Sequence, residues 1–240
     1  MDESFQHKLE KFDVGVVWLD ANKRVIALNR FASDVLVVRP GEVIGNEILQ
    51  FHPERSRAKV QWLLESSECP AESPPPMTMM INIPDRVLLI KVSKMFGEEG
   101  GAGTCMVFFD LTDVTTAPRL PSEAQDMPRM LFKLPIYKHG RVMLVDLSAV
   151  VHMKAEGHYT EVYTNDDHYL CNLSLSDLEG RLDPMQFVRV HRSHMVNLRY
   201  AGAFEKVDDQ CMLVMTAAGE PRIPISRNNV QKIKVLLGIS

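Results

Sequence analysis

The chain has 240 residues, 45% apolar and 24% charged, a composition that excludes an intrinsically disordered protein and suits one large or two small domains. No run approaches the roughly 18 apolar residues of a membrane span, and four scattered cysteines without a CxxC pair argue against a disulfide framework or zinc finger. The net charge of -4 is uneven: residues 1–127 hold 13 Lys and Arg against 19 Asp and Glu, and residues 128–240 hold 14 against 12. These features predict a cytoplasmic protein without a membrane partner, and they hint at an anionic partner for the second half.

The first half alternates short β patterns with helical ones. Two apolar runs, 14–20 and 24–29, flank a polar turn and predict a hairpin. A short helix follows, closed by a turn at Pro40-Gly41, and Pro53 can open a longer helix with Val60, Leu63 and Leu64 on one face. A Pro-rich loop and three further strands are expected at 66–76, 77–83, 86–94 and 104–115, and the glycine-rich 97–103 is expected to be a hairpin turn.

This order of elements resembles a PAS domain. The resemblance is carried by GVVWLD, RVIALNRFASDVL and GEVIGNEIL, which place the strands, the turn, an asparagine and a glycine as that family does. It implies an antiparallel sheet with short helices.

Three residues of the stretch 51–83 have the chemistry of soft-metal or haem ligands. His52 precedes the helix start at Pro53; its alternative interpretation is a helix-start or surface histidine. Cys69 lies in a Cys-Pro step, where proline keeps the chain out of a helix and leaves the thiol projecting. Strand alternation places Met79, unlike Met80, on the apolar face, where it is either a ligand or a core residue.

A closer resemblance covers nearly the whole chain. The segments FQHKLE, FHPERSR, ECPAESPPP, MMINIPDR and GTCMVFFDLTD are similar to the RcoM family of bacterial carbon-monoxide-sensing regulators, which carry a haem-bound PAS domain. It implies haem b, with His52 as the permanent axial ligand of the iron, Cys69 as the thiolate ligand of ferric haem and Met79 as its replacement in ferrous haem. Carbon monoxide is the implied effector.

The second half is a series of short β patterns with two small helices. A capping box, Ser174 with Asp177, predicts an amphipathic helix over 174–182, and a closing helix is expected from Ser226. The β patterns lie at 131–137, 141–146, 150–157, 158–164, 169–173, 187–198, 203–207, 211–215 and 222–225.

Four blocks of this half resemble the LytTR family of DNA-binding domains. They are AEGHYTEVYT, NLSLSDLEGRL, FVRVHRSHMVNL and IPISRNNV, in the order and spacing of that family. The resemblance covers residues 131–238 and implies DNA contacts from His158, His191, Arg192 and Arg227. Arginine suits guanine or phosphate, and histidine can hydrogen-bond base edges. Either histidine could instead be structural, and Asn197 and His194 are interpreted as structural.

The predicted fold class is α+β, an N-terminal PAS domain followed by a mostly-β LytTR domain. The expected limits are 1–115 for the haem-binding sensor, 116–130 for a linker and 131–240 for the DNA-binding domain. We expect a single-component regulator, not an enzyme, that acts as a homodimer on double-stranded DNA and is stimulated by carbon monoxide through six-coordinate haem. The alternative is a LytTR regulator whose PAS domain binds a flavin or another small molecule, or serves only in dimerisation.

Overall fold

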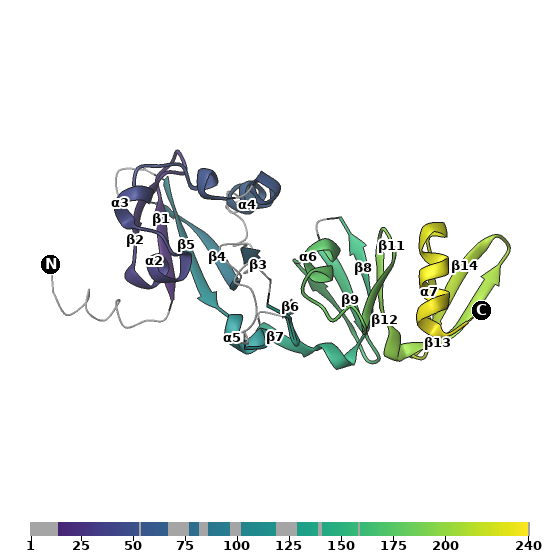
Figure 1. Cartoon of the computed structure of the whole chain (residues 1–240). Helices are drawn as coiled ribbons and strands as arrows, with labels where there is room; N and C mark the ends of the chain where they lie inside the picture. Colours follow the sequence, from purple (N-terminus) through teal and green to yellow (C-terminus); the bar gives the residue numbers. More distant parts are fainter. Residues whose placement is uncertain are drawn as a thin grey trace. The chain divides into compact units, whose positions relative to one another are not determined.

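The structure is a computed structural model that describes residues 14–52, 54–66, 77–81, 86–96, 102–118, 129–138, 141–157 and 159–239. The chain divides into two compact units, Met1–Thr112 and Asp113–Ser240, which are described one at a time (Figure 1). The expected limits at 115, 116–130 and 131 remain predictions, and most of the expected linker lies outside the described residues. Among the described residues, no helix has both the length and the apolar character that a bilayer crossing demands.

The first unit is a five-stranded antiparallel sheet in the order β2-β1-β5-β4-β3. The chain forms the hairpin β1-β2, runs through a series of helices and returns as the meander β3-β4-β5. This is the PAS arrangement that the sequence predicts. The elements are β1 Gly15–Leu19, β2 Val25–Leu28, α2 Arg30–Leu36, α3 Pro40–Val43, η1 Ile48–Phe51, α4 Glu54–Ser66, β3 Met77–Ile81, β4 Arg86–Phe96 and β5 Ala102–Asp110, followed by α5 Thr112–Thr115 at the junction with the second unit.

Asn29 and Gly45 are the asparagine and the glycine of the PAS-like sequence pattern, and each has a structural role. The Asn29 side-chain oxygen accepts hydrogen bonds from the backbone of Ala32 and Val16, so it caps α2 and ties that helix to β1. Gly45 has a φ of 85°, a left-handed conformation that disfavours a side chain, and its N–H bonds to the Val25 carbonyl. Both residues therefore fix the helical segment against the hairpin.

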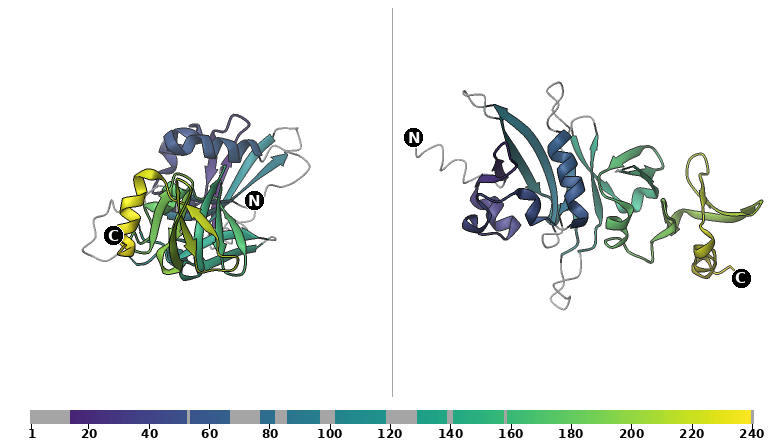
Figure 2. Two further views of the ribbon diagram at one scale, coloured as in Figure 1. Left: turned by 90° about the vertical axis from the view of Figure 1, so that its right-hand side faces the viewer. Right: turned by 90° about the horizontal axis from the view of Figure 1, so that it is seen from above.

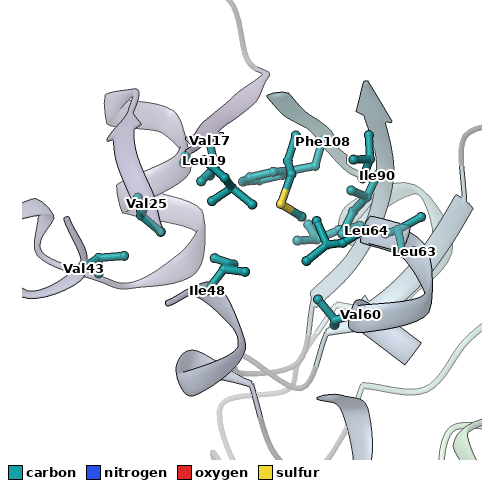
Figure 3. Packing of buried hydrophobic residues seen from close by; sticks show 14 of the residues in the cluster. Val17, Leu19, Val25, Val43, Ile48, Val60, Leu63, Leu64, Ile90 and Phe108 are labelled. Carbon is teal, nitrogen blue, oxygen red and sulfur yellow. The ribbon is translucent and has the colours of Figure 1, made fainter. Parts of the chain in front are cut away.

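One face of the sheet and α4 enclose the core of the first unit (Figure 3). Val60, Leu63 and Leu64 of α4 are each at most 2% exposed, which confirms the predicted apolar face of that helix. They pack in one cluster with Ile90 of β4 and Phe108 of β5. Burial of its apolar side holds the helix, because an isolated helix of 13 residues is only marginally stable in water.

The second unit contains a five-stranded sheet in the order β10-β9-β8-β12-β11, a three-stranded sheet β13-β14-β15 and the hairpin β6-β7. The small sheet and α7 lie side by side at the C-terminal end (Figures 1 and 2). The elements are β6 Lys133–Lys138, β7 Arg141–Asp146, η2 Leu147–Ala149, β8 Val150–Glu156, β9 Tyr159–Thr164, β10 His168–Cys171, α6 Leu175–Glu179, β11 Phe187–His191, β12 His194–Asn197, η3 Leu198–Tyr200, β13 Ala201–Val207, β14 Gln210–Met215, β15 Arg222–Pro224, η4 Arg227–Asn229 and α7 Val230–Leu237.

A shared core joins the two larger sheets and α7. Val188, Val190 and Val196 of the large sheet cluster with Leu213 of β14 and Ile233 of α7. The predicted capping box of α6 is present, since the Ser174 hydroxyl accepts from the Asp177 backbone and the Asp177 carboxylate accepts from the Ser174 backbone. This confirms a mostly-β domain with two small helices.

Four local expectations differ from the structure. The strand expected over 104–115 ends at Asp110, and Thr112–Thr115 forms the helix α5. Pro40-Gly41, expected as a turn, begins the four-residue helix α3, because proline is suited to the first helical position. The helix expected over 174–182 ends at Glu179, where Gly180 caps it. The run 187–198 is a tight hairpin rather than one strand, because Ser193 takes its backbone bond to Ala155 instead of extending β11.

We predict that Gly15→Ala destabilises the first unit. A methyl group there would lie 2.0 Å from a ring carbon of Phe108, which is buried in the core. The expected loss is about 1 to 3 kcal/mol of unfolding free energy. Urea titration followed by tryptophan fluorescence measures it, because both tryptophans, Trp18 and Trp62, lie in this unit.

The matched control is Gly41→Ala, since a methyl group at Gly41 meets no atom within 4 Å. It should leave the urea midpoint unchanged or slightly higher, because alanine is the better helix former. Equal midpoints for both variants would contradict the packing described for Gly15.

Candidate functional site

His52 is the buried histidine of the first unit. His52 directly follows η1 and is 6% exposed. Its Nδ1 lies 2.9 Å from the carbonyl oxygen of Ile48. A carbonyl can only accept, so Nδ1 carries the proton and Nε2 keeps its lone pair. Nε2 has no hydrogen-bond partner among the described residues. Metal-bound histidines have this arrangement, with one ring nitrogen held by a carbonyl and the other free to coordinate.

Burial lowers the pKa of His52, and the nearby positive charge of Arg57 lowers it further. The hydrogen bond with Ile48 raises the pKa, an effect smaller than that of burial but larger than that of Arg57. The imidazole is therefore held neutral around pH 7, which is the form that binds a metal.

His52 also lines an apolar cavity. Ten of the eleven lining residues are apolar, and His52 is the exception. Val17, Ile48, Ile90 and Phe108 of this lining converge from η1 and three strands (Figure 3). An apolar wall with a single imidazole fits the requirements of a haem pocket. The enclosed volume is about 40 Å³, far below the roughly 300 to 1,000 Å³ of ligand pockets, so a haem would fit here only if these walls separated.

Met79 and Cys69 are the other two predicted ligands. Met79 lies in β3, where its register partner is Leu88 of the core cluster that surrounds the cavity. Met80 pairs with Val87, which is also buried but does not belong to that cluster. Met77 likewise pairs with Ile90, which lines the cavity. The backbone register thus agrees with the alternation on which Met79 was chosen; the side chain of Met79 and the whole of Cys69 lie outside the described residues.

In the second unit, the hairpin β11-β12 carries His191 and Arg192. Arg192 is exposed in its turn, and none of the ion pairs within the described residues includes it. The turn is held from two sides, because Arg189 donates to the Arg192 carbonyl at 2.7 Å and the Ala155 N–H donates to the Ser193 carbonyl at 2.9 Å. The Arg192 side chain therefore projects from a fixed backbone.

Arg227 is brought to the same region by contacts distant in sequence. The Ser226 N–H donates to the Val190 carbonyl at 2.9 Å, and the Asn229 side chain donates to the carbonyls of Arg189 and Val190. These bonds tie the segment of Arg227 to β11. His191 and Arg227 consequently line one open groove of about 850 Å³.

His158 lies outside the described residues. On either side of it, β8 ends at Glu156, one residue before Gly157, and β9 begins at Tyr159. Because β8 pairs with β12, with Lys154 opposite His194, the β8-β9 turn and the β11-β12 turn lie at the same end of the sheet. The β8-β9 connection, the β11-β12 turn and the segment of Arg227 thus lie at one end of the domain.

Asn197 is structural, as interpreted from the sequence. It is fully buried, its side-chain nitrogen donates to the Val150 carbonyl at 2.7 Å, and its oxygen accepts from the Arg199 backbone. His194 is partly buried, and burial together with the positive potential of His191 and Lys154 lowers its pKa.

Sequence reasoning missed Arg189 and Asn229, which support the two candidate arginines. Arg189 also contacts Ser176 and Glu179 of α6, so it links that helix to the β11-β12 turn. Both residues lie inside the recognised blocks, yet an arginine and an asparagine there resemble DNA contacts as much as supports. Only their long-range partners distinguish the two roles.

Comparison with known proteins agrees with both halves. The family model of the LytTr DNA-binding domain matches residues 140–238. Two proteins of Paraburkholderia xenovorans, each named a heme-containing CO-sensing transcriptional regulator, RcoM 1 and RcoM 2, are 48% and 47% identical over 99% of this chain and 94% of their own length. The CO-responsive transcriptional regulator RcoM of Rhodospirillum rubrum is 33% identical over 99% of this chain and all of its own length. With this similarity along its length, the chain belongs to the RcoM family.

Proposed function

We propose that this chain is a transcription regulator that senses carbon monoxide through haem b in its PAS domain and binds double-stranded DNA through its LytTR domain. Its relatives from Paraburkholderia xenovorans are named heme-containing CO sensors. The observation that carries the proposal is His52, a buried imidazole whose Nδ1 is held by a carbonyl and whose Nε2 is free beside an apolar cavity.

The proposed ligand set follows from donor chemistry. Haem, when bound, supplies an iron centre whose ferrous form takes carbon monoxide. His52 holds one side through Nε2. On the other side, the anionic Cys69 thiolate favours ferric iron, and the neutral Met79 thioether favours ferrous iron. The neutral thioether of Met79 would be the weaker donor, so Met79 rather than His52 would give way to carbon monoxide.

The position of Met79 gives this exchange a structural consequence. Met79 belongs to β3, an edge strand that pairs only with β4 in the described sheet. An edge strand can shift with the loss of one ladder of hydrogen bonds, whereas a central strand would lose two. Release of Met79 therefore supplies two arrangements of one element, which is what a ligand-dependent switch needs.

The DNA-binding proposal rests on His158, His191, Arg192 and Arg227. His191 and Arg227 line one groove, Arg192 adjoins His191, and the turn containing His158 is at the same end of the sheet. Exposed arginines there can contact guanine or phosphate.

A cytoplasmic homodimer that regulates by binding rather than catalysis completes the proposal. The outer face of the PAS sheet presents Trp18 and Phe109, each 44% exposed. The register of β1 with β5 places Trp18 opposite Cys105, on the same side as Phe109 and away from the core residue Phe108. Large apolar side chains on one sheet face are suited to association between copies.

His52→Ala should lose most of the haem, because it removes the one imidazole of the cavity lining. Soret absorbance per protein after reconstitution measures this. His52→Gly with added imidazole should recover part of the absorbance, which separates loss of a ligand from misfolding. The control His168→Ala changes an exposed histidine of the other unit and should retain haem; full haem retention by His52→Ala would sink the axial role.

Met79→Leu should leave ferrous haem without its sixth protein ligand and raise carbon-monoxide affinity. If the thioether occupies at least nine-tenths of the ferrous protein, its removal raises the apparent affinity by about tenfold or more. Absorption spectra and carbon-monoxide titration test this. Met80→Leu is the matched control, since its register partner Val87 is buried outside the core cluster that contains Leu88. An unchanged ferrous spectrum in Met79→Leu would argue against the assignment.

Arg192→Ala and Arg227→Ala should each weaken specific DNA binding by about 1 to 3 kcal/mol and leave haem spectra intact. Duplexes selected by the wild-type protein from a randomised pool serve as the DNA, at fixed salt. Arg199→Ala provides the control, because Arg199 is exposed in η3, at the opposite end of β12. Wild-type affinity in both variants would refute the proposed interface.

A further inference from the structure

Ser193 lies in the β11-β12 turn with its hydroxyl between two imidazoles. Its Oγ is 2.8 Å from His191 Nδ1 and 3.0 Å from His194 Nδ1. The two rings are 5.6 Å apart at their centroids and are tilted to each other. One hydroxyl therefore connects two titratable side chains at the edge of the groove lined by His191 and Arg227.

The backbone of Ser193 decides how protons are placed in this cluster. Its N–H lies 3.3 Å from His191 Nδ1, and a peptide N–H can only donate. His191 Nδ1 must therefore be an acceptor, which puts the ring proton on Nε2. The Ser193 hydroxyl has one hydrogen and gives it to the same Nδ1, so its oxygen accepts from the Nδ1–H of His194.

The surroundings hold this geometry. The Ser193 carbonyl accepts from Ala155, and Arg189 fixes the preceding Arg192 carbonyl, so the turn cannot rotate freely. Burial and the neighbouring His191 and Lys154 lower the pKa of His194, which agrees with a neutral ring that carries one proton, on Nδ1.

We propose that Ser193 is a positioning residue that fixes His191 as an Nε2–H donor directed at a hydrogen-bond acceptor on DNA. The inference deepens the proposed DNA-binding function and rests on it. An Nε2–H donor suits guanine O6 or N7, adenine N7, thymine O4 or a phosphate oxygen, and it rejects the donor amino group of cytosine. The sequence predicts His191 as a contact; the structure assigns its donor polarity and the residue that sets it.

The first arm of the test needs no DNA. The full chain is isotope-labelled at its histidine nitrogens and kept in the ferrous carbonyl form, which is diamagnetic. Nitrogen-proton correlation NMR then separates protonated from unprotonated ring nitrogens. His191→Gln and His194→Gln assign the signals. We expect an Nε2–H tautomer for His191 and an Nδ1–H tautomer for His194. Ser193→Ala keeps the backbone N–H, so His191 should stay an Nε2–H tautomer, whereas His194 loses the acceptor of its Nδ1–H and should become a mixture. Ser193→Thr should keep the wild-type pattern. An Nδ1–H tautomer at wild-type His191, or an unchanged His194 in Ser193→Ala, overturns the inference.

The second arm measures affinity for duplexes selected by the wild-type chain. Ser193→Ala should bind about tenfold more weakly, and Ser193→Thr, which keeps the hydroxyl, should bind within about threefold of wild type. Ser148→Ala is the matched control; Ser148 also bonds a neighbouring side chain, Asp146, but precedes the opposite end of β8. Equal affinity of Ser193→Ala and wild type overturns the inference.

The pattern of loss identifies the acceptor. A loss confined to duplexes with a particular base pair assigns a base edge, and an equal loss on all selected duplexes assigns a phosphate. If the wild-type chain selects no duplex, the proposed DNA function fails and the DNA-reading part of the inference falls with it, while the NMR result still decides the tautomer.

Discussion

A single hydrogen bond, between His52 Nδ1 and the carbonyl oxygen of Ile48, determines what the sensor unit can bind. Because the carbonyl only accepts, it directs the proton to Nδ1 and leaves the Nε2 lone pair for a metal. Breaking this bond would leave a buried polar group unsatisfied, at a cost of about 1 to 3 kcal/mol, so the ring is held in one orientation. The cavity and the neutral imidazole can form the proposed haem site only in that orientation.

In each unit a backbone group bonds the Nδ1 of a histidine, as an acceptor at His52 and as a donor at His191. At His52 a backbone carbonyl makes Nδ1 the donor, which leaves the Nε2 lone pair for the proposed iron. At His191 a backbone N–H makes Nδ1 the acceptor, which leaves Nε2–H as the donor for the proposed DNA contact. In both units the adjacent peptide group determines which ring nitrogen carries the proton.

The sequence predicted what depends on local pattern. Alternation identified the strands, helical spacing identified Val60, Leu63 and Leu64 of α4, and the Ser174 capping box was recognised directly. It did not predict the division of 187–198 into a hairpin, the role of Arg189 and Asn229, or the tautomers of the histidines. These depend on contacts between distant segments, such as Ser226 with Val190, and no local period records such contacts.

The proposed function requires that carbon-monoxide binding in the PAS domain changes DNA binding by the LytTR domain. The most direct measurement is the affinity of the ferrous full chain for a selected duplex, determined at one salt concentration with and without carbon monoxide. A ligand shifts a two-state protein only if its affinities for the two states differ. If carbon monoxide changes the affinity for DNA by some factor, DNA must change the affinity for carbon monoxide by the same factor. We predict tighter DNA binding when carbon monoxide is present. Identical dissociation constants in its presence and absence would contradict a carbon-monoxide-responsive regulator.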